Sequence, residues 1–298
     1  MGRTQDNPLG LGDRLEGQDM NYETISVRPV AGAIGAEIHG VDLTGAISDL
    51  NISEIAQAQR DFLVVFFRNQ HITAAQHLAV AERFGTVLEY PMVKGIEGFP
   101  QIAPVVKLEH ETTNFGGIWH SDTAYLDAPP KATMLVAREL PPYGGDTLFS
   151  NMYLAYETLS DGLQMMLDGL RAVNSSAKAD ASATREDRLK TEAKQDSDTV
   201  LEAVHPVVRT HPETGKKLLY VNIGHTTHFE GMTVEESAPL LHFLFAHQSR
   251  PEFTCRFAWQ PGSIAFWDNR ACHHNPINDY HGFKRVMHRI TLAGERPE

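Results

Sequence analysis

The sequence predicts a mainly β protein with helices inserted between many short strands, arranged as a jelly-roll barrel. Runs rich in β-branched and aromatic residues, separated by turn residues, end the chain at 253–259, 263–267 and 285–292. Strands and helices do not alternate regularly, which disfavours a doubly wound α/β sheet. The chain has 298 residues, 42% of them apolar, which suffices for a single core. We therefore expect one domain over residues 23–298.

The first third of the chain predicts a tail followed by strands and two helices. Residues 1–22 are polar and glycine-containing, which predicts a disordered tail. Residues 25–38 alternate like a hairpin and lead to a helical stretch at 52–60. The apolar run at 62–67 predicts a buried strand. Thr73 then opens a capping box, which predicts a helix that stops at Gly85.

The remaining chain predicts further strands, two helical regions and a mobile segment. Residues 102–149 indicate strands and loops, and the leucine spacing of 153–170 indicates helices broken at Gly162. Residues 174–199 contain almost no large apolar side chain, so we expect a mobile surface segment there. The segment could act as a lid over a pocket or be a plain loop. Thr233 opens a second capping-box helix.

Composition narrows the classes of partner. A formal charge of −12, a pI near 5.6 and the lack of a dense basic run argue against nucleic acid. The apolar run at 62–67 is too short to span a bilayer, so no membrane partner is expected. The only two cysteines, Cys255 and Cys272, suit a reducing cytoplasm and make a disulfide framework unfavourable. We expect a small organic anion as partner and a homo-oligomer, a dimer or tetramer.

His120 and Asp122 are the first candidate metal ligands. Side chains two apart on a strand project from the same side, so one strand can offer an imidazole and a carboxylate to one ion. A distant histidine, His273 or His274, would complete a two-histidine, one-carboxylate face with three open coordination positions. Only one of these neighbours can face the ion, and geometry does not choose between them. Such a face is associated with non-haem Fe(II) oxygenases.

Other interpretations of the histidines remain at this point. Fifteen histidines make chance pairs common, and His228 with Glu230 has the same spacing. His211 and Glu213 also share it, but Pro212 and the following Thr-Gly indicate an exposed turn that cannot hold a rigid ion site. The candidate ligands could form a hydrogen-bonded surface pair on a non-catalytic jelly-roll binding module. A zinc-dependent hydrolase or lyase on the same barrel is a further alternative.

Two arginines in the last predicted strand point to an anion. Arg285 and Arg289 are four apart, so both fall on one face of residues 285–292. A buried guanidinium is costly unless a carboxylate or a ligand anion neutralises it. Asp268 and Asp279 are candidate partners within the protein. Ligand anions are the alternative, because a guanidinium grips a carboxylate or sulfonate through two parallel hydrogen bonds.

Several separated motifs resemble the taurine/aryloxyalkanoate dioxygenase family of Fe(II)- and 2-oxoglutarate-dependent enzymes. The resemblance runs from about residue 25 to residue 294, and its motifs are Trp119-His120-Ser121-Asp122, Gly144-Gly145-Asp146-Thr147, His205-Pro206-Val207-Val208-Arg209 with His211-Pro212, Trp267-Asp268-Asn269-Arg270, and Met287-His288-Arg289.

The resemblance implies a fold, cofactors and roles. The fold is a double-stranded β-helix, the cupin-like form of the jelly roll. Fe(II) would be held by His120, Asp122 and His274, which selects His274 over His273. Thr147 and Arg285 would hold the distal carboxylate of the cosubstrate 2-oxoglutarate. O2 would be the oxidant, and 2-oxoglutarate would be converted to succinate and CO2 while the substrate is hydroxylated next to a heteroatom.

The resemblance also suggests how the primary substrate is bound. Arg289 would face its anionic group, with Tyr90, Thr123, Gly116 and His225 as further contacts. Tyr90 stands where the taurine-specific pattern has a histidine, Gly116 replaces an asparagine, and His225 replaces an apolar aromatic residue. These departures disfavour taurine, and Gly116 opens space. An alkyl sulfate, another alkanesulfonate or an aryloxyalkanoate fits this pattern better.

Overall fold

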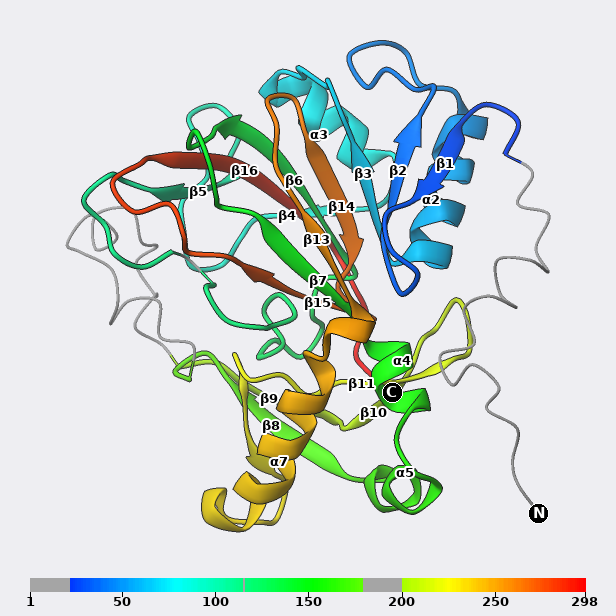
Figure 1. Cartoon of the computed structure of the whole chain (residues 1–298), viewed down its shortest axis with the longest axis vertical. Helices are drawn as coiled ribbons and strands as arrows, with labels where there is room; N and C mark the ends of the chain where they lie inside the picture. The colour runs from blue at the N-terminus through cyan, green and yellow to red at the C-terminus, as the bar shows by residue number, and fades with distance from the viewer. Residues whose placement is uncertain (1–21, 115, 179–199) are drawn as a thin grey trace.

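The computed structural model describes residues 22–114, 116–178 and 200–298 (Figure 1). The protein is mainly β with a few helices, as predicted. The predicted tail, apart from Tyr22, and residues 179–199 of the predicted lid lie outside the described residues. The hairpin at the start, both capping-box helices and the three C-terminal strands are confirmed.

A large sheet forms the upper part of the molecule (Figure 1). Its strands lie in the order β1-β2-β3-β14-β6-β16-β4, and β5 also pairs with β16. β2 and β3 run parallel and the other pairs run antiparallel. The strands of this main sheet are β1 (Ser26–Pro29), β2 (Ala36–His39), β3 (Val64–Phe67), β4 (Val87–Leu88), β5 (Ala103–Lys107), β6 (Ala132–Glu139), β14 (Ile264–Asp268) and β16 (Arg285–Leu292).

A three-stranded sheet packs against the inner face of the main sheet. Its order is β13-β7-β15, with β7 (Thr147–Asn151) between β13 (Thr254–Phe257) and β15 (Cys272–Pro276). Phe66 stacks on Phe257 with ring centroids 4.0 Å apart and meets Phe149 edge-on. A fully buried phenylalanine contributes about 1.5–3 kcal/mol through its lost contact with water. These rings therefore hold the two sheets together and fix the space between them.

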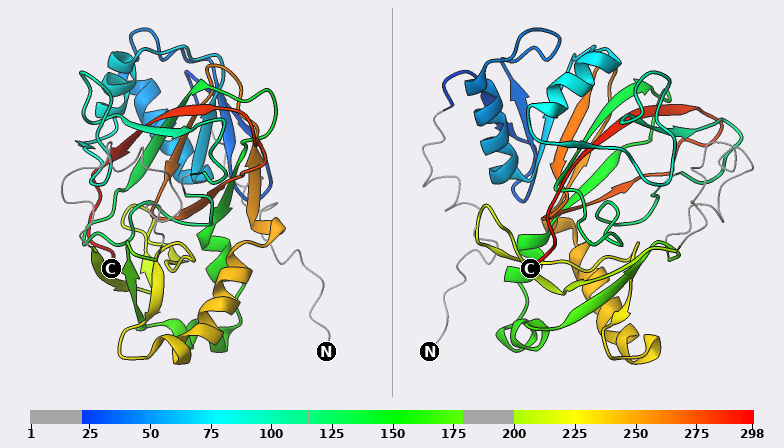
Figure 2. Two further views of the ribbon diagram at one scale, coloured as in Figure 1. Left: turned by 90° about the vertical axis from the view of Figure 1, so that its left-hand side faces the viewer. Right: turned by 180° about the vertical axis from the view of Figure 1, so that it is seen from behind.

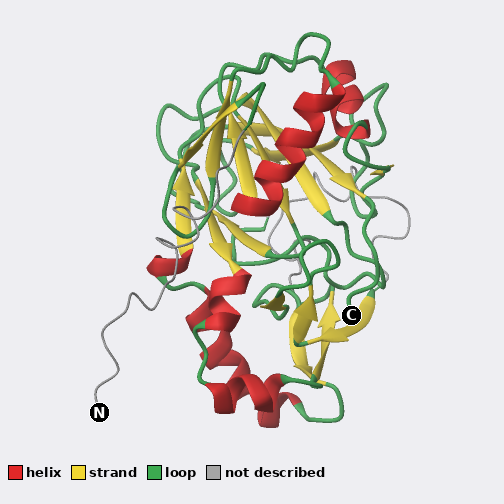
Figure 3. Cartoon of the chain, turned by 90° about the vertical axis from the view of Figure 1, so that its right-hand side faces the viewer, coloured by secondary structure: helices red, strands yellow, loops and turns green. Residues whose placement is uncertain are grey.

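Two helices cover the outer face of the main sheet (Figure 3). They are α2 (Asp49–Phe62) and α3 (Ala74–Glu82), and capping boxes at Ser48 and Thr73 satisfy their first backbone N–H groups. Along β3, Val65 and Phe67 pack on this side while Phe66 faces the inner side. The apolar run predicted as a strand at 62–67 is a strand only at Val64–Phe67, where it is buried on both faces. Phe62 ends α2 and Leu63 is the C-cap of that helix.

The lower part of the molecule contains the smaller sheets and the remaining helices (Figures 1 and 2). β8 (Arg171–Ser175) lies between β9 (Glu202–Pro206) and β12 (Thr226–Phe229), and β10 (Val208–Thr210) pairs with β11 (Lys217–Leu219). The helices here are α4 (Met152–Glu157), α5 (Asp161–Leu167), α7 (Val234–Gln248) and the 3-10 helix η1 (Pro251–Phe253).

Two predictions about this lower part need correction. The break between the helical pieces falls at residues 158–160, and Gly162 lies inside α5, because Ser160 rather than the glycine stands at the helix boundary. β8 extends through Ser175, so the first two residues of the segment predicted to be mobile are buried strand residues. In the part of the chain that is described, no helix has both the length and the apolar character for a membrane span.

Candidate metal centre

The two histidines predicted as metal ligands are joined by their backbones. His120 and His274 form an isolated antiparallel bridge, in which each N–H donates to the other's carbonyl at 3.0 and 2.9 Å. Their rings lie with centroids 4.1 Å apart. His274 belongs to β15, but residues 121 and 122 leave the bridge as a turn. The predicted strand around His120 is therefore limited to one bridge residue, and the turn brings Asp122 back to the same side.

Asp122 completes the group. Its Oδ1 lies 3.8 Å from His120 Nε2 and 3.9 Å from His274 Nε2, while its Oδ2 accepts a hydrogen bond from Thr133 at 2.7 Å. One ligand atom from each of the three residues lies within 4.8 Å of the others, and all three residues are buried. One carboxylate oxygen is thus anchored in the protein and the other faces both imidazoles.

Charges and burial keep these groups in the protonation states that metal binding requires. Burial alone would raise the pKa of Asp122, but the Arg289 guanidinium, the two histidines and the Thr133 hydroxyl together lower it to about 2. Burial lowers the pKa of His120 and lowers that of His274 well below its ordinary value. His120 Nδ1 is 2.7 Å from the Ile118 carbonyl, so Nδ1 carries the proton and Nε2 keeps its lone pair. The donor set is therefore two neutral imidazoles and one carboxylate.

This donor set fits a divalent transition metal. Two imidazoles and a carboxylate on one face suit Fe(II) and leave positions for other ligands. Gly116 lies against the same edge, where a Cβ would come within 3.1 Å of His120 Nε2 and its φ of 68° also favours glycine. A side chain at this position would crowd the histidine edge that faces the ion.

A cavity opens beside the two histidines. Thr147, Arg285 and Arg289 line it together with His120 and His274. Thr147 begins β7 and Arg285 begins β16, so residues separated by almost 140 positions meet only through the packing of the two sheets. The cavity thus places the two predicted metal histidines, the predicted cosubstrate residues and the predicted substrate arginine around one space.

Arg285 has hydrogen-bonding capacity that the protein does not use. It is 4% exposed, and no side-chain or backbone partner for its Nε and Nη2 occurs among the described residues. Burial lowers its pKa, and Tyr280 opposes this effect. Asp268 and Asp279 are not its partners, because Asp268 pairs with Arg270 and Asp279 accepts from the Gly145 N–H at 2.7 Å. A buried guanidinium with two unused N–H groups is suited to bind a ligand anion.

Arg289 is held differently. Its Nη1 lies 3.3 Å from Asp122 Oδ1, and its Cζ lies 4.1 Å above the Tyr90 ring. Burial by itself would lower its pKa, but Asp122 and a hydrogen bond with Tyr90 raise it. Tyr90 is also hydrogen-bonded to Tyr125. The predicted substrate arginine is therefore tied to the metal carboxylate on one side and to Tyr90 on the other.

The other predicted substrate residues lie around the histidines but do not line the cavity. His225 meets the His120 ring edge-on at 6.0 Å, and burial lowers its pKa to about 3. Thr123 follows Asp122 with a φ of 46°, a strained value for a residue with a branched side chain. Among the described residues that line the cavity, Arg289 is the only one of the five predicted substrate contacts.

Sequence reasoning missed several residues of this region. Lys107 lines the cavity, is 2% exposed and lies 4.2 Å from the Tyr280 ring centroid; burial lowers its pKa. Trp259 donates to Thr147 Oγ1 at 3.0 Å. Lys107 is the register partner of Arg285 across β5 and β16, but nothing local in the sequence reveals this pairing.

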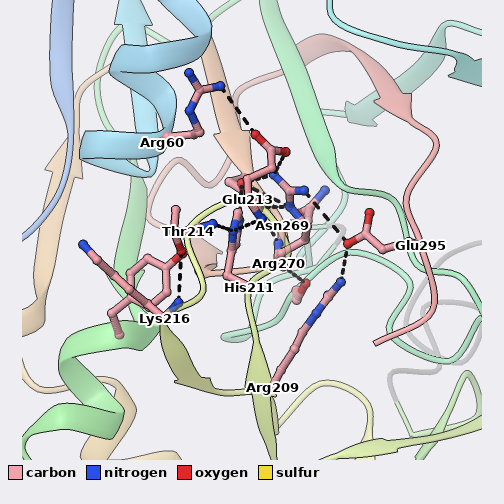
Figure 4. Close-up of polar contacts among 12 residues, drawn as sticks. Arg60, Arg209, His211, Glu213, Thr214, Lys216, Asn269, Arg270 and Glu295 are labelled. Atoms are coloured by element: carbon pink, nitrogen blue, oxygen red, sulfur yellow. Dashed lines mark hydrogen bonds and ion pairs between the residues drawn. The ribbon is translucent and has the colours of Figure 1, made fainter. Parts of the chain in front are cut away.

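A second cluster, called the ion-pair cluster, consists of the exposed Glu213 and of three buried residues, His211, Asp268 and Arg270. Figure 4 shows His211, Glu213 and Arg270. Arg270 Nη2 lies 2.6 Å from Asp268 Oδ2 and 2.8 Å from Glu213 Oε1. His211 Nδ1 accepts from the backbone N–H of Glu213, so its Nε2 donates to Asp268 at 3.1 Å. The turn that follows His211 is exposed, as predicted. The His211 side chain itself is only 1% exposed, because it pairs with Asp268 inside the protein.

The fold and site together define a class of protein. A buried two-histidine, one-carboxylate group beside a cavity lined by a guanidinium with unused N–H groups fits a non-haem metal centre that takes an organic anion. Residues 26–291 match the family described as taurine catabolism dioxygenase TauD, TfdA family, and the chain belongs to this family.

Individual relatives agree with this assignment. The chain is 34% identical to an alpha-ketoglutarate-dependent sulfate ester dioxygenase from Pseudomonas putida, over 92% of this chain and 91% of the relative. It is 35% identical to an alkylsulfatase from Acinetobacter baylyi, over 92% and 86%. The crystal structure of a taurine dioxygenase from Burkholderia xenovorans superposes with a TM-score of 0.78 at 38% identity, covering 92% of both chains. The predicted resemblance and the predicted enzyme class, a 2-oxoglutarate-dependent dioxygenase, are confirmed.

Proposed function

We propose that this enzyme hydroxylates an alkyl sulfate at the carbon next to the ester oxygen. The observation that carries the proposal is the single cavity in which His120 and His274 lie beside Arg285 and Arg289. Oxidative chemistry on an anion needs a metal, a place for 2-oxoglutarate and a second anion site, and the cavity offers groups for each.

His120, Asp122 and His274 would hold Fe(II), which, with bound 2-oxoglutarate, supplies the O2-dependent oxidation of a C–H bond. Arg285 offers two unused N–H groups, Nε and Nη2, to the distal carboxylate of 2-oxoglutarate. Thr147 would add a hydroxyl contact, because its Oγ1 already accepts from Trp259 and its proton is left to donate. Arg289 would bind the sulfate and keep the substrate near the ion.

The overall reaction balances. One O2 and one 2-oxoglutarate yield succinate, CO2 and a substrate in which one C–H has become C–OH. For an alkyl sulfate, that carbon then carries both the hydroxyl and the sulfate ester oxygen. Breakage of the carbon–oxygen bond to sulfate gives an aldehyde, sulfate and a proton. The chain's own contribution is to bind both anions and to keep water away from the reacting carbon.

Two relatives support a sulfate ester over the other anions predicted from sequence. The sulfate ester dioxygenase and the alkylsulfatase match over nine-tenths of this chain at 34% and 35% identity. Alkanesulfonates and aryloxyalkanoates remain the comparison substrates. The zinc hydrolase and the binding module predicted as alternatives account for neither the unused N–H groups of Arg285 nor the family match.

The first experiment tests the metal centre. Anaerobic addition of Fe(II) and 2-oxoglutarate should give a metal-to-ligand charge-transfer absorption band, and His120→Ala or His274→Ala should remove it. Ser160→Ala, far from the cavity at the start of α5, is the matched control and should keep the band. A wild-type protein that binds Zn(II) but shows no band with Fe(II) would overturn the proposal.

The second experiment tests the substrate. Succinate formation is measured with hexyl sulfate, hexanesulfonate and phenoxyacetate at equal concentrations, together with release of sulfate. We expect hexyl sulfate to give the highest kcat/KM and one sulfate per succinate. Faster turnover of hexanesulfonate or phenoxyacetate would contradict the choice of sulfate ester while leaving the dioxygenase class intact.

We further propose that the main sheet and the β13-β7-β15 sheet are the two walls of a double-stranded β-helix. Their face-to-face packing around Phe66 and Phe149 supports this arrangement. A cytoplasmic location is in keeping with Cys255 and Cys272, which are both free and buried. Location and a dimeric or tetrameric state stay predictions.

A further inference from the structure

Asp122 Oδ2, the carboxylate oxygen that does not face the histidines, is the end of a chain of buried hydrogen bonds. The family motifs give this chain no role. Thr133 Oγ1 lies 2.7 Å from Asp122 Oδ2, and Asn269 Nδ2 lies 2.7 Å from Thr133 Oγ1. Trp267 Nε1 lies 2.8 Å from Asn269 Oδ1. All four residues are at most 2% exposed, so water does not compete for these bonds.

The direction of every bond in this chain follows from its last member. An indole N–H can only donate, so Asn269 Oδ1 is the acceptor and Asn269 Nδ2 must donate onward. Thr133 Oγ1 accepts that bond, which leaves its own proton to donate to Asp122. The carboxylate therefore receives a hydrogen bond at Oδ2, and this orientation cannot reverse while Trp267 is in place.

The same residues also restrain the neighbouring ligands. Ser121 donates to the Asn269 carbonyl at 2.6 Å, which fastens the turn between His120 and Asp122. The Trp267 ring lies 4.7 Å from the His274 ring. Asn269 thus restrains His120 and Asp122 through Ser121 and Thr133, and Trp267 contacts His274. Thr133, by contrast, contacts Asp122 alone among the three ligands.

We propose that Thr133 is a positioning residue: its hydroxyl occupies Asp122 Oδ2 and so allows the carboxylate to offer only Oδ1 to the metal. A carboxylate that binds through one oxygen uses one coordination position, which leaves room for a chelating cosubstrate and for O2. Without the Thr133 bond, Arg289 still contacts Asp122 Oδ1, but Oδ2 loses its hydrogen-bond donor and is able to bind the metal as well. The hydrogen bonds from Trp267 to Asn269 and from Asn269 to Thr133 direct the Thr133 hydroxyl proton toward Asp122.

The inference rests on the metal centre of the proposed function, and Mn(II) serves as the probe. Thr133→Val replaces the hydroxyl by a methyl group of nearly the same size, whereas Thr133→Ser keeps the hydroxyl. Thr291→Val is the matched control, because Thr291 is a buried threonine directly opposite Thr133 across β6 and β16. Mn(II) affinity is titrated by the paramagnetic resonance signal of the free ion.

We expect Thr133→Val to weaken Mn(II) binding about 10- to 100-fold, as is usual when a hydrogen bond to a metal ligand is lost. Thr133→Ser and Thr291→Val should stay within about threefold of wild type. The anaerobic Fe(II)–2-oxoglutarate absorption band should shift in Thr133→Val and keep its wild-type position in Thr133→Ser. A purely structural role for the hydroxyl would lower stability without moving this band.

The outcomes separate this inference from the proposed function. If wild-type protein binds Mn(II) but Thr133→Val binds it equally well, the positioning role is wrong and the metal centre stands. Equal weakening in Thr133→Ser and Thr133→Val would also overturn it, because the hydroxyl would then not be the cause. If Thr133→Val does not fold, Thr133→Ala against Thr133→Ser decides by the same two measurements. Failure of wild-type protein to bind Mn(II) refutes the metal centre itself.

Discussion

Two clusters in this molecule are built from the same types of side chain and use them in opposite ways. The ion-pair cluster of His211, Glu213, Asp268 and Arg270 satisfies its own hydrogen bonds (Figure 4). The second, called the cavity cluster, consists of His120, Asp122, His274 and Arg285. Among the described residues, its His274 Nδ1 and Arg285 Nε and Nη2 have no partner, although both residues are buried.

The two clusters differ in how fully the protein uses their polar groups. Each cluster contains histidine, aspartate and arginine, and the His-x-carboxylate spacing of His120 and Asp122 recurs at His211 and Glu213. Neither residue type nor spacing separates them. Polar groups that are buried and yet unused by the protein do separate them, because such groups cost stability unless a ligand engages them.

The largest change in the free energy of unfolding is expected from a substitution that breaks the ion-pair cluster. Asp268→Ala leaves Arg270 and His211 buried without their shared carboxylate, so the free energy of unfolding should fall by about 3–5 kcal/mol. Urea denaturation followed by circular dichroism measures the change. Glu230→Ala is the control, because its pair with Arg171 is exposed and should be worth at most about 1 kcal/mol. Equal losses in the two variants would contradict the contrast between paired and exposed carboxylates.

Substitution of Arg285 and of Arg270 by leucine should change the stability of the fold in opposite directions. Arg285→Leu removes two unused buried donors, so we expect stability to stay equal or rise, whereas Arg270→Leu should lower it. Binding of 2-oxoglutarate in the presence of Mn(II), measured by calorimetry, should weaken in Arg285→Leu by about 3 kcal/mol. A destabilised Arg285→Leu variant with normal 2-oxoglutarate binding would refute the division between the clusters.

Acid should destabilise the fold through the cavity cluster. Burial, followed by the nearby His120, lowers the pKa of His274 well below its ordinary value, so this imidazole stays neutral when folded. The unfolded chain takes up the proton below about pH 6.5, so stability falls with decreasing pH by at most about 1.4 kcal/mol per unit. His274→Leu should flatten this slope in metal-free protein, measured by urea denaturation between about pH 7 and pH 5.

His77→Leu is the reference for that slope. His77 lies on the outer side of the main sheet, away from the metal ligands, and burial lowers its pKa to about 3. The same sign applies, since the folded pKa is depressed and the unfolded chain binds the extra proton. An unchanged slope in His274→Leu beside a flattened one in His77→Leu would show that His274 is already charged in the fold.

The smallest expected effect is a change in substrate KM that tests the role of Arg289. Tyr90→Phe keeps the ring beneath the guanidinium but removes the hydroxyl that hydrogen-bonds to it. We expect KM for the anionic substrate to rise by a factor that corresponds to about 1 kcal/mol, with the affinity for 2-oxoglutarate unchanged. Initial rates of succinate formation check this. A change in 2-oxoglutarate affinity would instead place Arg289 beside the cosubstrate.

The sequence alone determined those features that depend on neighbours along the chain. Periodicity and capping residues at Thr73 and Thr233 located two helices. The apolar run at 62–67 located the buried strand Val64–Phe67, although Phe62 belongs to the preceding helix. The motifs around His120 and Trp267 determined the family. These signals are local, because a helix or strand is specified by the spacing of its own side chains.

The tertiary structure decided which polar groups find partners. It put His211 inside against Asp268, tied Arg289 to Asp122, and left Arg285 with unused donors. It also connected Trp267 and Asn269 through Thr133 to Asp122, across strands far apart in the chain. Hydrogen bonding of a buried group depends on atoms within about 3 Å. Only the packing of the two sheets brings those atoms together.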